Sequence, residues 1–130
     1  MSEKLEIKLT TLNKIVVVSY DDFFVDEKNN YVDRYRVDIY ENEKGEKGDL
    51  IDCETGFMSF EDALKSSIEY LGELLTIEIF VIIQDLTQKK DWYSELKKQL
   101  HFDIQQRDLD AISRMIRRLK RRLKKECMAA

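Results

Sequence analysis

Proline is absent from the 130 residues of this chain, and cysteine and histidine are scarce. Without proline, nothing in the sequence marks a stiff linker, so we expect a single domain over residues 1–130. The two cysteines, Cys53 and Cys127, lie far apart, and we expect both to be reduced thiols. The one histidine, His101, has no second ligand at zinc-site spacing, which argues against a structural zinc.

Long apolar runs are also missing. The longest, Ile79 to Ile83, is far shorter than the ~20 apolar residues that a membrane span needs. The first residues, MSEKLEIK, lack the apolar centre of a secretory signal. The composition is rich in Lys, Glu, Ile and Asn and resembles that of proteins from AT-rich bacteria and their phages. We therefore expect a cytoplasmic protein in a bacterial host, with no membrane partner.

Catalytic motifs are absent as well. No GxxxxGKS/T, GxGxxG or HExxH occurs in the sequence. A cation site at Asp21, Asp22 and Asp26 would lack the glycine and the distal glutamate of an EF-hand loop. Pairs of carboxylates say little in a chain with 26 Asp and Glu residues. We expect no enzyme, no cofactor and no metal.

Charge is abundant and unevenly distributed. Residues 107–125 contain nine Lys and Arg and two Asp, whereas residues 1–86 contain 20 Asp and Glu and nine Lys and Arg. The overall net charge of −4 therefore averages two surfaces of opposite sign. Such a distribution is typical of proteins that bind charged partners.

The first half of the chain predicts strands. Alternation of apolar and polar residues indicates four of them, over residues 5–10, 14–20, 31–40 and 50–53, the last short and at an edge. The charged stretch Glu41 to Asp49 is predicted to be a solvated loop. Ser59 with Asp62 forms a variant capping box, and the apolar spacing that follows predicts a helix ending near Gly72.

The second half predicts helices, with one ambiguous segment. Residues 76–84 fit a buried strand by their β-branched content and a helix by their apolar spacing, and we leave both open. A clearer helical period follows, with one apolar face formed by Trp92, Tyr93, Leu96 and Leu100. The whole pattern predicts an α+β fold, with an antiparallel sheet of about four strands in residues 1–58 and helices in residues 59–130.

The last predicted helix is long and amphipathic. Its apolar residues follow the three-four spacing of a heptad seam. We call them the seam: Leu109, Ile112, Ile116, Leu119 and Leu123. The basic side chains that lie largely away from the seam form what we call the basic strip: Arg114, Arg117, Arg118, Arg121, Arg122 and Lys125. Like charges four residues apart destabilise a helix by a few tenths of a kcal/mol per pair, so they need a compensating partner.

Several roles are open for this helix. The seam can dock on the helix of Trp92, Leu96 and Leu100, leaving the strip solvated or neutralised by the acidic part of the chain. Alternatively, the strip binds nucleic-acid phosphates or an acidic protein, since arginine favours bidentate contacts. The seam can also form a homodimer. Membrane binding is disfavoured because the apolar stripe is narrow and has no aromatic residue at its centre.

Acidic residues gather in the predicted turns of the first half. The simpler interpretation is that these residues lie in solvent-exposed turns and bind no partner. The functional interpretation is a surface that meets a basic protein in place of phosphates. We call these residues the acidic set: Asp21, Asp22, Asp26, Glu27, Glu43 and Glu46.

A short, acidic, proline-free α+β chain without a catalytic motif resembles the small phage and plasmid inhibitors of the anti-CRISPR and anti-restriction kind. The resemblance covers composition and architecture, and no family motif assigns a residue. It implies a non-enzymatic inhibitor that occludes a nucleic-acid-processing complex, with a nucleic-acid-binding nuclease as partner. The alternative is a nucleic-acid-binding regulator whose basic helix makes the main contact.

Overall fold

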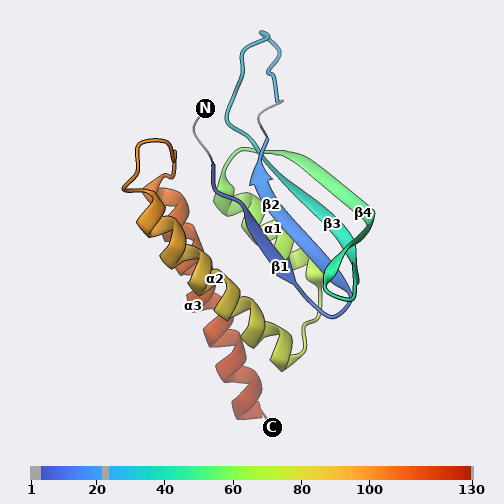
Figure 1. Ribbon diagram of the computed structural model, residues 1–130. Coiled ribbons are helices and arrows are strands. Elements are labelled where there is room, and N and C mark those ends of the chain that lie inside the picture. The colour runs from blue at the N-terminus through green and yellow to red at the C-terminus, as the bar shows by residue number, and fades with distance from the viewer. Residues whose placement is uncertain (1–3, 22–23, 130) are drawn as a thin grey trace.

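The computed structural model describes residues 4–21 and 24–129, and side chains as far as residue 126 (Figure 1). The strands are β1 (Ile7–Thr10), β2 (Lys14–Tyr20), β3 (Tyr35–Glu43) and β4 (Glu46–Phe57). The helices are α1 (Phe60–Leu71), α2 (Thr76–Leu96) and α3 (Gln106–Ala129). The predicted α+β order, with an antiparallel sheet first and helices after it, is confirmed.

The sheet is an antiparallel meander in the order β1-β2-β3-β4. Its period-two alternation places Val18 of β2 between Ile7 of β1 and Val37 of β3, and all three are at most 1% exposed. α1 packs on β2 and β3 and α2 packs beside β1, while α3 packs on these two helices (Figure 1). A single cluster of buried side chains joins the sheet to the helices.

The hairpin between β3 and β4 corrects two predictions. The predicted loop 41–49 is strand apart from a two-residue turn, Lys44-Gly45, in which both φ angles are positive. The side-chain oxygen of Asn42 accepts from the Gly45 amide at 2.7 Å. As a result β4 spans 12 residues instead of the predicted 50–53. Charged side chains suggested a loop because both strands of this hairpin tip are exposed to solvent.

The ambiguous segment 76–84 is the first part of α2, so the helical alternative is confirmed and the strand alternative is wrong. Its apolar side chains at helical spacing, including Ile79, Ile82 and Leu86, are buried, and this packing outweighs β-branched propensity. The predicted face of the following helix is partly wrong. Tyr93 is buried, but Trp92 is exposed within α2, and Leu100 is exposed beyond the end of α2 at Leu96.

The seam of α3 lies inside the fold. Leu109, Ile112 and Leu119 are at most 3% exposed, and they belong to the same core cluster as the sheet. Ile116 is 9% exposed and Leu123 is half-buried against the cluster. α3 packs on both α2 and α1. A homodimer through this seam would first have to uncover the core.

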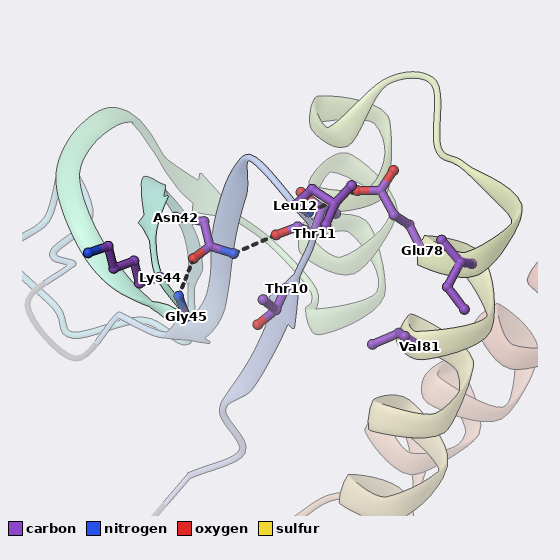
Figure 2. A pocket seen from close by; sticks show the side chains of 9 residues that line it. Thr10, Thr11, Leu12, Asn42, Lys44, Gly45, Glu78 and Val81 are labelled. Atoms are coloured by element: carbon purple, nitrogen blue, oxygen red, sulfur yellow. Dashed lines mark hydrogen bonds between the residues drawn. The ribbon is translucent and has the colours of Figure 1, made fainter.

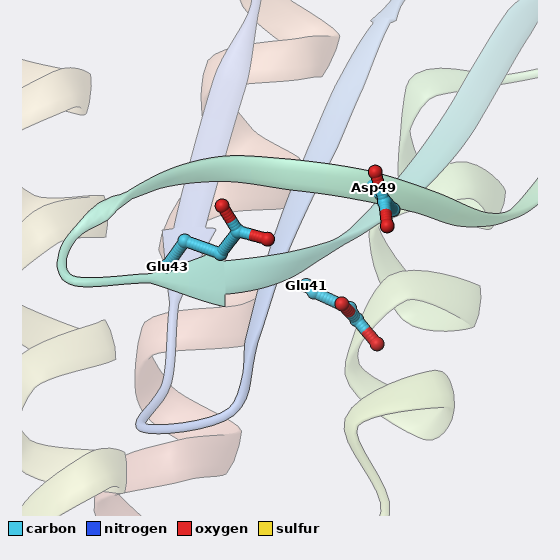
Figure 3. A group of neighbouring side chains, drawn as sticks. All are labelled: Glu41, Glu43 and Asp49. Atoms are coloured by element: carbon cyan, nitrogen blue, oxygen red, sulfur yellow. The ribbon is translucent and has the colours of Figure 1, made fainter.

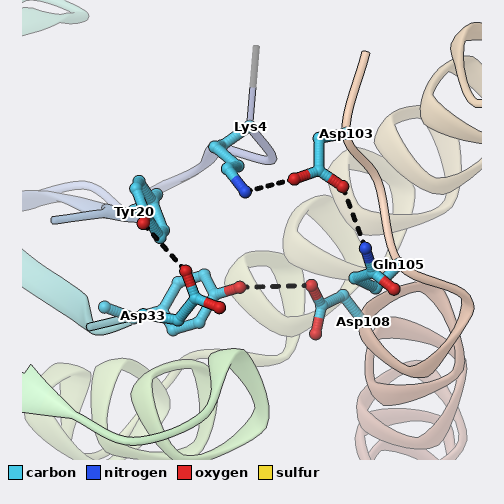
Figure 4. A network of polar contacts seen from close by, with 7 residues as sticks. Lys4, Tyr20, Asp33, Asp103, Gln105 and Asp108 are labelled. Carbon is cyan, nitrogen blue, oxygen red and sulfur yellow. Dashed lines mark hydrogen bonds and ion pairs between the residues drawn. The ribbon is translucent and has the colours of Figure 1, made fainter. Parts of the chain in front are cut away.

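A polar network ties the start of α3 to the sheet (Figure 4). Lys4 forms an ion pair with Asp103. The Tyr35 hydroxyl donates to Asp108 at 3.3 Å, and both groups are buried. Burial raises the pKa of Asp108 above its ordinary value, against the opposing effect of Arg107, whose guanidinium lies 3.8 Å away. These contacts join the start of α3 to β3 and to the segment before β1.

The raised pKa of Asp108 predicts a pH-dependent stability. The folded protein binds this proton more tightly than the unfolded chain, so stability is lost as pH rises from the ordinary aspartate range, near ~4, through the raised pKa. We expect wild type to lose stability relative to Asp108→Asn across that window. Urea unfolding of both proteins at a series of pH values measures the difference. If the free energy of unfolding of wild type minus that of Asp108→Asn stays constant or rises with pH, the prediction is contradicted.

Candidate polyanion-binding site

The exposed side of α3 forms a basic hollow with α1. Six side chains line a space of about 340 Å³, of which five are cationic and one is a carboxylate. They are Glu61 and Lys65 from α1, and Arg114, Arg117, Arg118 and Arg121 from α3. The seam positions this surface, because burying the apolar stripe of an amphipathic helix turns its charged side outward.

One arginine of the hollow is neutralised inside the fold. The Arg114 guanidinium donates to Glu61, with 2.6 Å between Nε and Oε2. This hydrogen bond holds the pKa of Glu61 below its usual range, and Lys65 and Arg118 act in the same direction. Glu61 is therefore fully ionised near neutral pH and fixes α1 against α3.

The remaining arginines of the hollow differ from Arg114 in making no ion pair with the described residues. Within the described part of the chain, no acidic group pairs with Arg117, Arg118 or Arg121. All three are exposed, and Lys65 is exposed across from them on α1. Internal neutralisation thus accounts for Arg114 and leaves a concentration of positive charge beside it.

The other two members of the basic strip lie beyond the hollow. Arg122 is half-buried and lies 3.5 Å from Glu126 one turn later. Lys125 is exposed at the C-terminal part of the helix. From Arg114 to Lys125 the strip extends roughly 16 Å at 1.5 Å per residue, about five nucleotide steps of one strand of a duplex.

The acidic set does not form one surface. Asp21 is buried just after β2, at the sheet end where Tyr20 pairs with Tyr35. Glu43 and Glu46 face each other at the opposite end of β3, beside the hairpin turn. The expected single acidic face is therefore divided between two ends of the sheet.

The remaining members of the acidic set lie near Asp21. Asp26 accepts from the main-chain N–H groups of Lys28 and Asn30, at 2.9 and 3.0 Å, so it shapes a turn. Glu27 is exposed. Asp22 lies outside the described residues. This end of the sheet therefore offers one exposed carboxylate among the described members of the set.

The hairpin contains a tighter group of carboxylates. One oxygen each of Glu41, Glu43 and Asp49 lies within 4.8 Å of the others, and all three side chains are exposed (Figure 3). Oxygen ligands of this kind suit Ca²⁺ or Mg²⁺. Nothing beyond the carboxylates themselves points to an ion, and we assign no metal here.

Cys53 is the only cysteine whose side chain is described. Its Sγ lies 2.9 Å from a guanidinium nitrogen of Arg36, which also holds Asp38. Burial raises the pKa of the Cys53 thiol, with the neighbouring Asp38 second. A raised pKa lowers the thiolate fraction and makes this thiol a poor nucleophile near neutral pH.

Sequence reasoning missed two residues of the hollow, Glu61 and Lys65. They lie four residues apart on α1, a spacing typical of an exposed ion pair within one helix. No local pattern links α1 to the exposed side of α3. The tertiary packing of the two helices brings them together.

No helix among the described residues is long and apolar enough to cross a bilayer. No protein-family model matches the chain, no curated protein is a recognisable relative, and no solved structure resembles it.

Proposed function

We propose that this chain is a non-enzymatic binding protein that holds the phosphate backbone of a nucleic acid in the hollow between α1 and α3. The observation that supports the proposal is a group of exposed arginines that have no acidic partner among the described residues: Arg117, Arg118 and Arg121. Guanidinium groups bind phosphate oxygens in bidentate fashion. A phosphate would also relieve the repulsion between Arg117 and Arg121, four residues apart on one helix.

The chemistry of the hollow favours backbone contact over base recognition. Among the described residues, its lining contains no aromatic or amide side chain. Contacts from Arg and Lys to phosphates position a protein without reading sequence. The nucleic acid would therefore be chosen by shape or by the rest of a complex. This fits a protein that acts inside a nucleic-acid-processing assembly.

A salt series tests the proposal. The affinity for a labelled DNA duplex of about 20 base pairs is measured by fluorescence anisotropy at several NaCl concentrations. About six phosphate contacts predict a slope near −5 in a plot of log affinity against log salt. No measurable binding at low salt, for either this duplex or the same sequence as RNA, would refute it.

The exposed carboxylates of the β3–β4 hairpin support a second function, the charge-complementary inhibitor. Glu41, Glu43 and Asp49 would meet a basic face of a nuclease, as in inhibitors of the anti-CRISPR kind. Affinity capture from bacterial lysate, with and without nuclease treatment, separates the two functions. A partner lost on nuclease treatment supports phosphate binding. A protein partner that wild type retains after nuclease treatment, and that the double variant Glu43→Lys with Asp49→Lys loses, supports the inhibitor.

A further inference from the structure

On the outer edge of strand β1, side chains of α2 hydrogen-bond to the main chain at both ends of the strand and leave a gap in the middle. On its outer side, the Tyr93 hydroxyl accepts from the Glu6 amide at 3.1 Å and donates to the Glu6 carbonyl at 2.9 Å. At the other end, the Glu78 carboxylate accepts from the Leu12 amide at 3.0 Å. Both side chains come from α2, which runs beside the strand (Figure 1).

Between these two contacts, β1 presents unpaired main-chain groups. The Thr11 amide donates to the Lys14 carbonyl across the β1–β2 turn. The main-chain N–H and C=O groups of the odd-numbered residues of β1 therefore point toward β2. The main-chain groups of residues 6, 8, 10 and 12 then point away from β2. Side chains of α2 hydrogen-bond to those of residues 6 and 12. Among the described residues, no group outside the sheet bonds to the main chain of Lys8 or Thr10.

Two hollows flank this open stretch, and Thr10 belongs to both. The first has a volume of about 380 Å³ and lies between the β1–β2 turn and the start of α2 (Figure 2). Its apolar side chains are partly or largely exposed, with Leu12 at 66%, Ile77 at 62% and Val81 at 37%. The rest of the lining consists of two threonines, Glu78 and the tip of the β3–β4 hairpin, and the exposed apolar side chains leave room for one apolar side chain of a ligand.

The second hollow is polar, and positive charge prevails along the groove as a whole. It has a volume of about 380 Å³ and is lined by Lys8, Lys89 and Asp85, with Trp92 at its far end. In the first hollow Lys44 adds a further ammonium group. Glu78 adds a carboxylate, but its two oxygens already accept the amides of Leu12 and Leu75. Three ammonium groups therefore line the groove with two carboxylates, and of these only Asp85 makes no hydrogen bond among the described residues.

We propose that the groove between β1 and α2 binds an extended acidic segment of a partner protein. The segment adds a fifth strand to the sheet by pairing with Lys8 and Thr10, a known mode of peptide recognition. Its apolar side chain fills the hollow of Leu12, Ile77 and Val81. Its acidic side chains face Lys8 and Lys89. This surface is separate from the basic hollow of α1 and α3 and does not depend on the function proposed for it.

The test uses two labelled peptides and hydrogen exchange. The probes are an eight-residue peptide alternating Glu and Val, and its charge-reversed counterpart alternating Lys and Val. We expect the Glu–Val peptide to bind more tightly by about tenfold and to slow exchange of the Lys8 and Thr10 amides. In the free protein these amides should exchange much faster than those of Ile7 and Leu9, which face β2.

Two protein variants and one altered peptide localise the binding. Thr10→Pro removes an outward-pointing main-chain N–H, a change that an edge strand tolerates. Ile77→Glu places a charge in the apolar hollow and leaves the sequence of β1 unchanged. Each should weaken the Glu–Val peptide by about tenfold, as should N-methylation of its alternate amides. Equal or tighter binding of the Lys–Val peptide would overturn the proposal, as would no binding of either. Protection of Lys8 and Thr10 by self-association, without peptide, would overturn it in favour of a second copy.

Discussion

Replacing Arg117, Arg118 and Arg121 together with glutamine should weaken nucleic-acid binding by roughly 100-fold or more at low salt. These three guanidinium groups lie exposed in the basic hollow without an acidic partner among the described residues. Each is expected to make a charge-assisted contact to phosphate. Removing three of about six contacts should also halve the salt slope, from about −5.4 to about −2.7. Fluorescence anisotropy at several salt concentrations measures both quantities.

A matched triple variant controls for overall charge. Lys28→Gln, Lys44→Gln and Lys47→Gln change the net charge by the same amount at exposed positions outside the basic hollow. This variant should keep the salt slope of wild type. Equal losses in the two triple variants would mean that net charge, and not the hollow, attracts the nucleic acid.

A single change at the hollow should act in the opposite direction. Glu61→Gln removes the one carboxylate that lines it and releases Arg114 for phosphate contact. Its affinity for the same duplex should therefore rise, although the link between α1 and α3 is weakened. A fall in affinity without loss of folded structure would contradict the assignment of this hollow.

Replacing Ile112 with alanine should lower the free energy of unfolding by about 3 kcal/mol. Ile112 is fully buried in the middle of the seam, where α3 joins the core shared by α2 and the sheet. Alanine would leave a cavity that surrounding side chains fill only in part. Urea unfolding followed by circular dichroism measures the loss.

An exposed isoleucine provides the control for this variant. Ile77 is 62% exposed, so Ile77→Ala should change the free energy of unfolding by less than about 0.5 kcal/mol. A loss below about 1 kcal/mol for Ile112→Ala would mean that α3 is not packed through its seam. The basic strip would then lack the rigid support on which the hollow depends.

Much of the fold follows from local sequence patterns. The capping serine Ser59 accepts from the Asp62 amide at 3.1 Å, and Gly72 ends α1 with a φ of 68°, as their positions predict. The inward face of Tyr35, Val37 and Ile39 follows from alternation with a period of two. These features depend on neighbours in the chain, which a single sequence displays.

The misses have a common physical origin. The long exposed hairpin of β3 and β4 looks like a loop because strand pairing, and not an apolar face, holds its charged tip. Residues 76–84, left open between strand and helix, are helical because their apolar side chains at helical spacing are buried in the core, and this packing outweighs β-branched propensity. Local composition does not show the strand pairing of the hairpin, and it leaves strand and helix balanced for residues 76–84.

The candidate site could be predicted only in part. Heptad spacing correctly placed the seam residues toward the core and the arginines on the surface. The sequence does not show that Glu61 reaches Arg114 across 53 residues, nor that Lys65 joins the hollow. Nor does it show that the acidic set is divided between two ends of the sheet. All three depend on how the elements pack.

The most direct test follows the arginine side chains themselves. In a nitrogen-15 NMR titration with a DNA duplex of about 20 base pairs, the Nε–H signals of Arg117, Arg118 and Arg121 should shift and saturate. The signals of Arg34 and of Arg36, which Asp38 already holds, should stay in place. Shifts at Arg34 and Arg36 in place of the α3 arginines, or no shift in any arginine, would contradict a phosphate site in the hollow between α1 and α3.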